Sequence, residues 1–185
     1  MPSMTPPSRG ATVSSALFWG DQPYLLRLAA LGLLAERGLA PTEIDATEWQ
    51  GGETADLATP SLWGDQRALL VANAHRLPES GAAELAAYLR SPSPEAVLVL
   101  TVVSRGRNAP SLAKVVQAAG GLIGHVSVKR ADLPRWVLER ARVRDLRLSP
   151  PGAAALVAAI GEDPAALDQG VEQLSAAPSA ETIWR

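Results

Sequence analysis

The turn Gly20-Asp21-Gln22-Pro23-Tyr24 stands where an α/β nucleotide-binding protein would keep its phosphate loop, between an apolar stretch and a leucine-rich one. Such a loop needs glycines for close backbone approach, a lysine for the phosphates and a serine or threonine for Mg²⁺. The turn has no lysine, Asp21 would repel a phosphate, and Pro23 removes a backbone donor. We therefore predict that Gly20–Tyr24 binds no phosphate (it is not a Walker A loop) and that the chain carries no cofactor.

No other set of residues has the spacing of a catalytic or metal site. The apolar run Val97–Val103 ends without an acidic pair. The chain has no cysteine, and its two histidines, His75 and His125, lie far apart in the sequence. No serine has a histidine arranged beside it as a general base. We expect no catalytic residue and no metal ligands.

Positive charges gather after the apolar run and again further along the chain. Arg105, Arg107 and Lys114 form the first group. The second comprises Lys129, Arg130, Arg135, Arg140, Arg142, Arg144 and Arg147, against Asp132, Glu139 and Asp145. One interpretation is a solvated helix face with i,i+4 ion pairs. The other is a patch that contacts DNA phosphates, with Arg105, Arg107 and Lys114 as candidate contacts.

The stretch Thr59-Pro60-Ser61-Leu62-Trp63-Gly64-Asp65-Gln66 is the candidate for protein binding. Neighbouring residues of a helix point about 100° apart, so Leu62 and Trp63 cannot both face one core. At the end of a helical turn before a glycine they could form an outward apolar plug, which is the composition of a binding hot spot. Alternatively, Trp63 folds back and caps the domain.

Length and composition are those of a globular protein. The chain has 185 residues, 47% of them hydrophobic, which is enough for one good core or two small domains. Its net charge of −2 predicts no general attraction to nucleic acid. The absence of cysteine fits a cytoplasmic protein, and no targeting or membrane-spanning segment stands out. We expect no membrane partner.

Strands alternating with helices between Ser15 and Val128 predict a three-layer α/β domain with a parallel sheet. The most apolar strand, Ala96–Val103, should lie in its centre. Three short helices then predict a small all-helical domain. We expect a disordered lead-in over 1–14, the α/β domain over 15–130, the helical domain over 131–178 and a linker over 179–185.

Two elements near the start are predicted in more detail. A helix over Pro23–Arg37 should be capped by Asp21 and ended by Gly38. Its buried face is predicted to comprise Leu25, Leu28, Ala29, Gly32 and Leu33. A second strand is predicted over Ile44–Trp49, ended by Gly51-Gly52.

The order of elements resembles the delta subunit of bacterial DNA polymerase III, a clamp-loader subunit. The resemblance extends over about Leu17–Leu174 and rests on five stretches: Leu17–Leu26, Thr59–Arg67, Leu89–Pro94, Leu133–Val137, and the helix pair Ala154–Asp163 and Leu167–Leu174. It implies an AAA+-like module, in which a P-loop-NTPase-like α/β domain is followed by a helical lid. It also implies that this module has lost its ATP site. It also implies a collar domain that this sequence does not include.

The resemblance also implies a function. Delta-like subunits open the ring-shaped sliding clamp by inserting two adjacent apolar residues into a pocket on the clamp. The inserted residues align with Leu62 and Trp63, and the neighbouring Pro60 and Ser61 are further candidates for clamp binding. The family usually has Phe where this chain has Trp63. Implied partners are the sliding clamp (beta subunit), the tau, gamma and delta prime subunits through a collar, and, indirectly, primer-template DNA. Two alternatives are a degenerate P-loop-like NTPase and an Arg-rich DNA-binding module.

Overall fold

The computed structural model describes residues 13–59 and 66–177, which form two compact units divided between Ser127 and Val128. We call them the α/β unit and the helical unit and describe each by itself. The α/β unit contains β1 (Ser15–Gly20), α1 (Pro23–Ala35), β2 (Thr42–Asp45), the 3-10 helix η1 (Ala46–Glu48), α2 (Ala55–Ala58), β3 (Arg67–Ala72), η2 (Ala74–Arg76), α3 (Glu79–Arg90), β4 (Ala96–Val103), α4 (Ser111–Ala118) and β5 (Leu122–His125).

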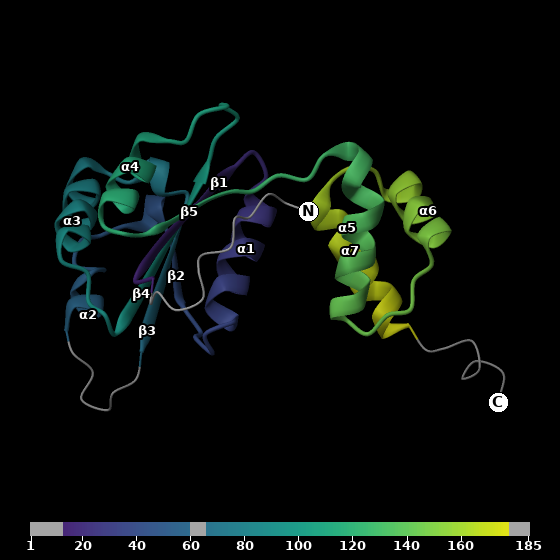
Figure 1. Cartoon of the computed structure of the whole chain (residues 1–185), viewed down its shortest axis with the longest axis horizontal. Coiled ribbons are helices and arrows are strands. Elements are labelled where there is room, and N and C mark those ends of the chain that lie inside the picture. Colours follow the sequence, from purple (N-terminus) through teal and green to yellow (C-terminus); the bar gives the residue numbers. More distant parts are fainter. Residues whose placement is uncertain (1–12, 60–65, 178–185) are drawn as a thin grey trace. The chain divides into compact units, whose positions relative to one another are not determined.

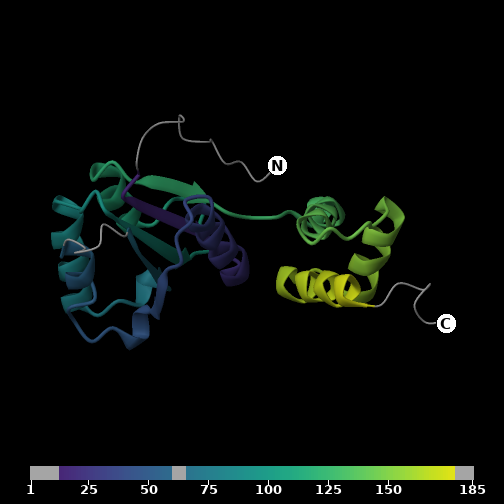
Figure 2. The ribbon, with the colours of Figure 1, turned by 90° about the horizontal axis from the view of Figure 1, so that it is seen from below.

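Five parallel strands form one sheet in the order β2-β3-β4-β1-β5. The central strand β4 is buried almost throughout, as its continuous run of apolar and β-branched residues predicts. Helix α1 covers one face of the sheet, and α2, α3 and α4 cover the other (Figures 1 and 2). The predicted three-layer α/β fold is confirmed.

The alternation of side chains along the strands divides the core into two layers. Leu17 and Trp19 of β1 and Leu98 and Leu100 of β4 belong to one cluster with buried residues of α3 and α4. The intervening residues, such as Phe18 and Val99, are also buried and face the opposite way, toward α1. The sheet is therefore packed on both faces.

Helix α1 differs from its prediction at the cap and at the buried face. Gln22, not Asp21, precedes the helix, and its side chain makes no capping bond. Of the residues predicted to be buried only Leu25 is, and Leu26, Ala30 and Leu34 complete the buried face. The helix carries leucine or alanine nearly all round, so periodicity does not fix which side faces the sheet.

The second strand lies earlier than predicted and is shorter. It spans Thr42–Asp45, after which Ala46–Glu48 form η1 instead of continuing the strand. The cause is local, because the Asp45 carboxylate accepts hydrogen bonds from the backbone amide and the hydroxyl of Thr47. The last strand, β5, ends at His125. Trp49, predicted to lie in a strand, instead follows η1, and its side chain is buried.

The helical unit consists of η3 (Arg130–Asp132), α5 (Leu133–Val143), α6 (Pro150–Ile160) and α7 (Pro164–Ala176), and the three α-helices contact one another (Figure 2). Ser149 and Asp163 cap α6 and α7 by accepting bonds from Gly152 and Ala165 amides. Leu133, Trp136 and Val137 of α5 and Leu167 and Val171 of α7 are buried. The core of the small all-helical unit is formed by these apolar side chains.

Candidate functional site

The predicted clamp-binding residues Pro60, Ser61, Leu62 and Trp63 lie outside the described residues. The structure does describe the frame from which their segment leaves and to which it returns. Helix α2 ends at Ala58 before it, and β3 begins at Arg67 after it. This frame is therefore the described part of the candidate site.

The frame is held by hydrogen bonds on both sides of the segment. The Arg67 guanidinium donates to the carbonyl oxygen of Asp56 at 2.6 Å, joining β3 to α2. The Arg67 amide donates to the carbonyl of Glu95 at 3.1 Å. On the other side, the Thr59 amide and hydroxyl both donate to the carbonyl of Ala55. Both ends of the segment are thus fixed to the α/β unit.

Glu84 of α3 organises the loop that leads into this frame. Its Oε1 accepts from the amide and the hydroxyl of Thr54, at 3.0 and 2.7 Å. Its Oε2 accepts from the Gly52 amide at 2.9 Å and from the indole nitrogen of Trp49 at 3.3 Å. Half-burial of Glu84 opposes ionisation, but the bonds from Gly52, Thr54 and Trp49 outweigh it, so the pKa of Glu84 lies below its usual value.

Two further features fix the same loop. Glu53 accepts hydrogen bonds from the amides of Gln50 and Gly51. Gly51 and Gly52 have φ angles of +104° and +93°, which residues with a side chain rarely adopt. In the sequence the two glycines indicated only the end of a strand. Glu84 was not predicted, because nothing in the sequence links that residue to donors 30 or more positions earlier.

The turn after β1, where a phosphate loop would lie, is short and closely packed. Only Asp21 and Gln22 separate β1 from α1. The carbonyl of Gly20 accepts from the Ser104 amide at 2.7 Å. A side chain at Gly20 would collide with the carbonyl oxygen of Val126. Parallel α/β sheets bind ligands beyond the carboxyl ends of their strands, and at the last residue of β1 the Gly20 carbonyl and the space beside its Cα are already taken by the backbone of Ser104 and Val126.

Polar residues at the carboxyl ends of β2, β3 and β4 bond to one another. Asn73 has a left-handed backbone, with φ of 54°. Its side-chain amide donates to Asp45 at 2.6 Å, and its backbone amide donates to the Thr101 hydroxyl at 3.3 Å. Bonds from Thr47, followed by the one from Asn73, lower the pKa of Asp45. These residues were not predicted as a group, and their mutual bonds give them a structural role.

The candidate phosphate contacts lie in two different parts of the α/β unit. Arg105 and Arg107 are exposed in the loop between β4 and α4. Lys114 is exposed on α4, where it lines a groove together with Arg90. None of the three forms an ion pair with another described residue.

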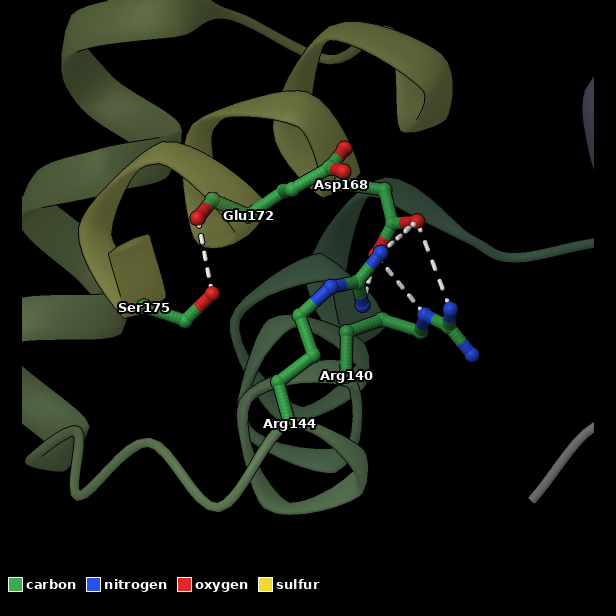
Figure 3. A network of polar contacts seen from close by, with 5 residues as sticks. All are labelled: Arg140, Arg144, Asp168, Glu172 and Ser175. Carbon is green, nitrogen blue, oxygen red and sulfur yellow. Dashed lines mark hydrogen bonds and ion pairs between the residues drawn. The ribbon is translucent and has the colours of Figure 1, made fainter. Parts of the chain in front are cut away.

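Several arginines of the second group are engaged in ion pairs within the helical unit. Arg140 and Arg144 of α5 both bond the buried carboxylate of Asp168 on α7, at 2.7 to 3.3 Å (Figure 3). Arg130 pairs with Glu162 at 2.8 Å, and Arg135 pairs with Glu139 at 3.5 Å. These pairs favour the structural interpretation for Arg130, Arg135, Arg140 and Arg144, and Asp168 is a partner that sequence analysis did not identify.

Over the described ranges, no group of three or more histidine or acidic residues could hold a metal ion. The same ranges contain no helix with the length and apolar character needed to cross a bilayer. His75 is exposed, and the ring of His125 lies against Trp19 with centroids 4.3 Å apart.

No protein-family model matches the chain, and no curated protein matches it. Solved structures do match. The DNA clamp loader delta protein of Bacillus subtilis matches with a TM-score of 0.63 and 15% identity, over 88% of this chain and 53% of that one. The RuvB Holliday junction branch migration motor of Thermotoga maritima matches with a TM-score of 0.61 and 14% identity, over 89% of this chain and 55% of that one.

This chain spans about half the length of the structures that it matches. The matches extend across most of the chain, so they include strands and helices of both units. The resemblance to the clamp-loader delta subunit is confirmed at the level of the fold: the chain has the AAA+-like architecture of a parallel α/β module followed by a helical unit.

Proposed function

We propose that this chain is a delta-type clamp-loader subunit, which binds and opens a DNA sliding clamp through Leu62 and Trp63 without hydrolysing nucleotide. The observation that carries the proposal is the match of 88% of the chain to the Bacillus subtilis delta protein. The short turn Asp21–Gln22, with no lysine, supports a role without an ATP site.

The frame around the segment supports the same role. An apolar plug that opens a ring must transmit force to the rest of the subunit, so both of its ends need firm attachment. The bonds from Arg67 to Asp56 and from Thr59 to Ala55 provide such attachment. Burial of Leu62 and Trp63 in a clamp pocket would contribute about 2 kcal/mol for each side chain.

Binding to the cognate sliding clamp, measured by surface plasmon resonance, tests the proposal. The double variant Leu62→Ala/Trp63→Ala should lose binding, whereas Trp63→Phe should keep it. The matched control is Val143→Ala/Leu174→Ala, because both residues are exposed and apolar but lie in the helical unit. Failure of the folded wild-type chain to bind the clamp would overturn the proposal.

A nucleotide arm separates the proposal from the NTPase alternative. ATP with Mg²⁺ should leave the melting temperature unchanged, since a ligand that binds only the native state would raise it. A rise in melting temperature that is lost on changing residues of the Gly20–Tyr24 turn would favour the degenerate NTPase.

Contact with nucleic acid through Arg105 and Arg107 is a second candidate function. The observation in its favour is the absence of any Asp or Glu between Ala96 and Ala131, in a chain whose net charge is −2. Binding of primer-template DNA should then fall steeply with salt, and Arg105→Gln/Arg107→Gln should reduce that slope. The subunit contacts implied by the resemblance, to the tau, gamma and delta prime subunits, are tested in the same way with purified partners.

A further inference from the structure

A groove crosses the outer surface of the α/β unit between the C-terminal turns of α3 and α4. Its volume is about 690 Å³, and Leu89, Pro92, Val115 and Ala118 contribute its apolar lining. Both helices lead from the carboxyl edge of the parallel sheet back to its amino edge, and they lie side by side and contact each other (Figure 1). The groove is therefore an open channel between two parallel helices.

Packing of the core does not account for all of the apolar side chains that line the groove. Ala113 and Val116 form the buried side of α4, while Val115 is 38% exposed. Among the described residues of the α/β unit, Val115 is the only large apolar side chain that is exposed to this degree. Leu89 also lines the groove but is buried, and the other apolar lining residues include the small Ala86 and Ala118.

Cations mark the rim of the groove. Arg90 lies in the last turn of α3 and Lys114 in α4, both are exposed, and neither pairs with another described residue. No carboxylate belongs to the lining, and the sequence from Ala96 to Ala131 contains none. An apolar lining with cations on both sides is complementary to an apolar stripe flanked by carboxylates.

We propose that this groove binds an acidic amphipathic helix of a partner protein, independently of clamp binding. The apolar face of that helix covers Val115 and Leu89, and its glutamates or aspartates meet Arg90 and Lys114. The lining disfavours nucleic acid as the occupant. A phosphate backbone gains nothing from an aliphatic floor, and none of the lining side chains is aromatic, so bases have no surface to stack on.

A labelled model peptide tests the proposal by fluorescence anisotropy with the full chain. Its sequence carries leucines at i, i+3, i+4 and i+7 and glutamates on both flanks. The wild type should bind it, with Lys114→Glu and Val115→Ser each weakening binding about tenfold or more. A peptide of the same composition with its leucines scattered around the helix should bind more weakly by a similar factor.

The matched control is Arg107→Glu, which reverses an exposed charge in the loop before α4 but outside the groove lining. It should leave binding within about twofold. Lys114→Gln is a milder variant for use if Lys114→Glu lowers the melting temperature.

Three outcomes would overturn the proposal. The first is failure of the wild type to bind the peptide. The second is an equal loss of binding in Arg107→Glu and Lys114→Glu, which would indicate a diffuse charge effect. The third is displacement of the peptide by single-stranded DNA together with no effect of Val115→Ser, which would indicate a nucleic-acid surface. None of these outcomes depends on whether the chain binds a sliding clamp.

Discussion

The guanidinium of Arg67 donates a hydrogen bond to the carbonyl oxygen of Asp56 at 2.6 Å, closing the base of the segment that carries Leu62 and Trp63. Helix α2, which supplies the acceptor, has only four residues. So short a helix has no stability of its own, because nucleation costs more than one turn returns. Its persistence depends on tertiary bonds such as this one.

We therefore expect Arg67→Met to loosen α2 without unfolding the protein. Loss of a charged donor to a carbonyl costs about 1.5 kcal/mol, so hydrogen exchange at the Ala58 and Thr59 amides should accelerate roughly tenfold. If the proposed function holds, clamp affinity should fall in parallel. Arg90→Met makes the same chemical change at an arginine away from α2, and it should leave both amides unaffected. Unchanged exchange in Arg67→Met would mean that α2 is held by other contacts.

Glu84→Gln should destabilise the α/β unit by about 2–3 kcal/mol. One carboxylate oxygen faces the two donors of Thr54, and the other faces the amide of Gly52 and the indole of Trp49. In either orientation a glutamine would turn its NH₂ group toward two of these donors. Urea unfolding followed by tryptophan fluorescence measures the change. Glu79→Gln, on the exposed first turn of the same helix, should cost only about 0.5 kcal/mol.

The contribution of Glu84 should also depend on pH with a definite sign. Its pKa in the folded protein is lowered, so the ionised form is the one that stabilises the fold. That stability is fully present above the usual glutamate pKa of about 4.3 and is lost as the pH falls through the lower folded value. The difference in unfolding free energy between wild type and Glu84→Gln should therefore shrink below about pH 4. A difference that stays constant into strong acid would contradict the assignment.

Elements with strong local signals were predictable from the sequence. The observed bounds of β4 equal the predicted range Ala96–Val103. A continuous run of apolar and β-branched residues defines this strand. The buried face of α1 was not predictable, because leucines lie on several sides of it and only packing against β4 selects among them.

Long-range polar contacts were the other part that the sequence did not reveal. The sequence has an excess of arginine near residue 140, which is compatible with a DNA-binding patch. The carboxylate that pairs Arg140 and Arg144 is Asp168, 28 and 24 positions away. Only the packing of α7 against α5 brings it there. The same holds for Glu84 and the donors on the loop before α2.

Asp168→Asn should be strongly destabilising to the helical unit. The Asp168 side chain is 5% exposed and that of Arg140 is 17% exposed, so Asp168→Asn removes a buried negative charge that both Arg140 and Arg144 contact. Breaking such a pair typically costs 3–5 kcal/mol. Thermal unfolding detected at α5, α6 and α7 by NMR should show the loss. Glu139→Gln removes the exposed partner of Arg135 and should cost about 0.5 kcal/mol or less.

Gly81→Ala and Gly32→Ala should change stability in opposite directions, although both replace a glycine inside a helix. A methyl group at Gly81 would lie 2.8 Å from the ring of Trp49, which the indole bond to Glu84 holds in place. We expect Gly81→Ala to destabilise by about 1–3 kcal/mol through overpacking, despite the better helix propensity of alanine. At Gly32 nothing lies within 4 Å, so alanine there should stabilise α1 by about 0.5–1 kcal/mol. Urea denaturation of the two variants measures both changes, and stabilisation by Gly81→Ala would show that Trp49 can move away from α3.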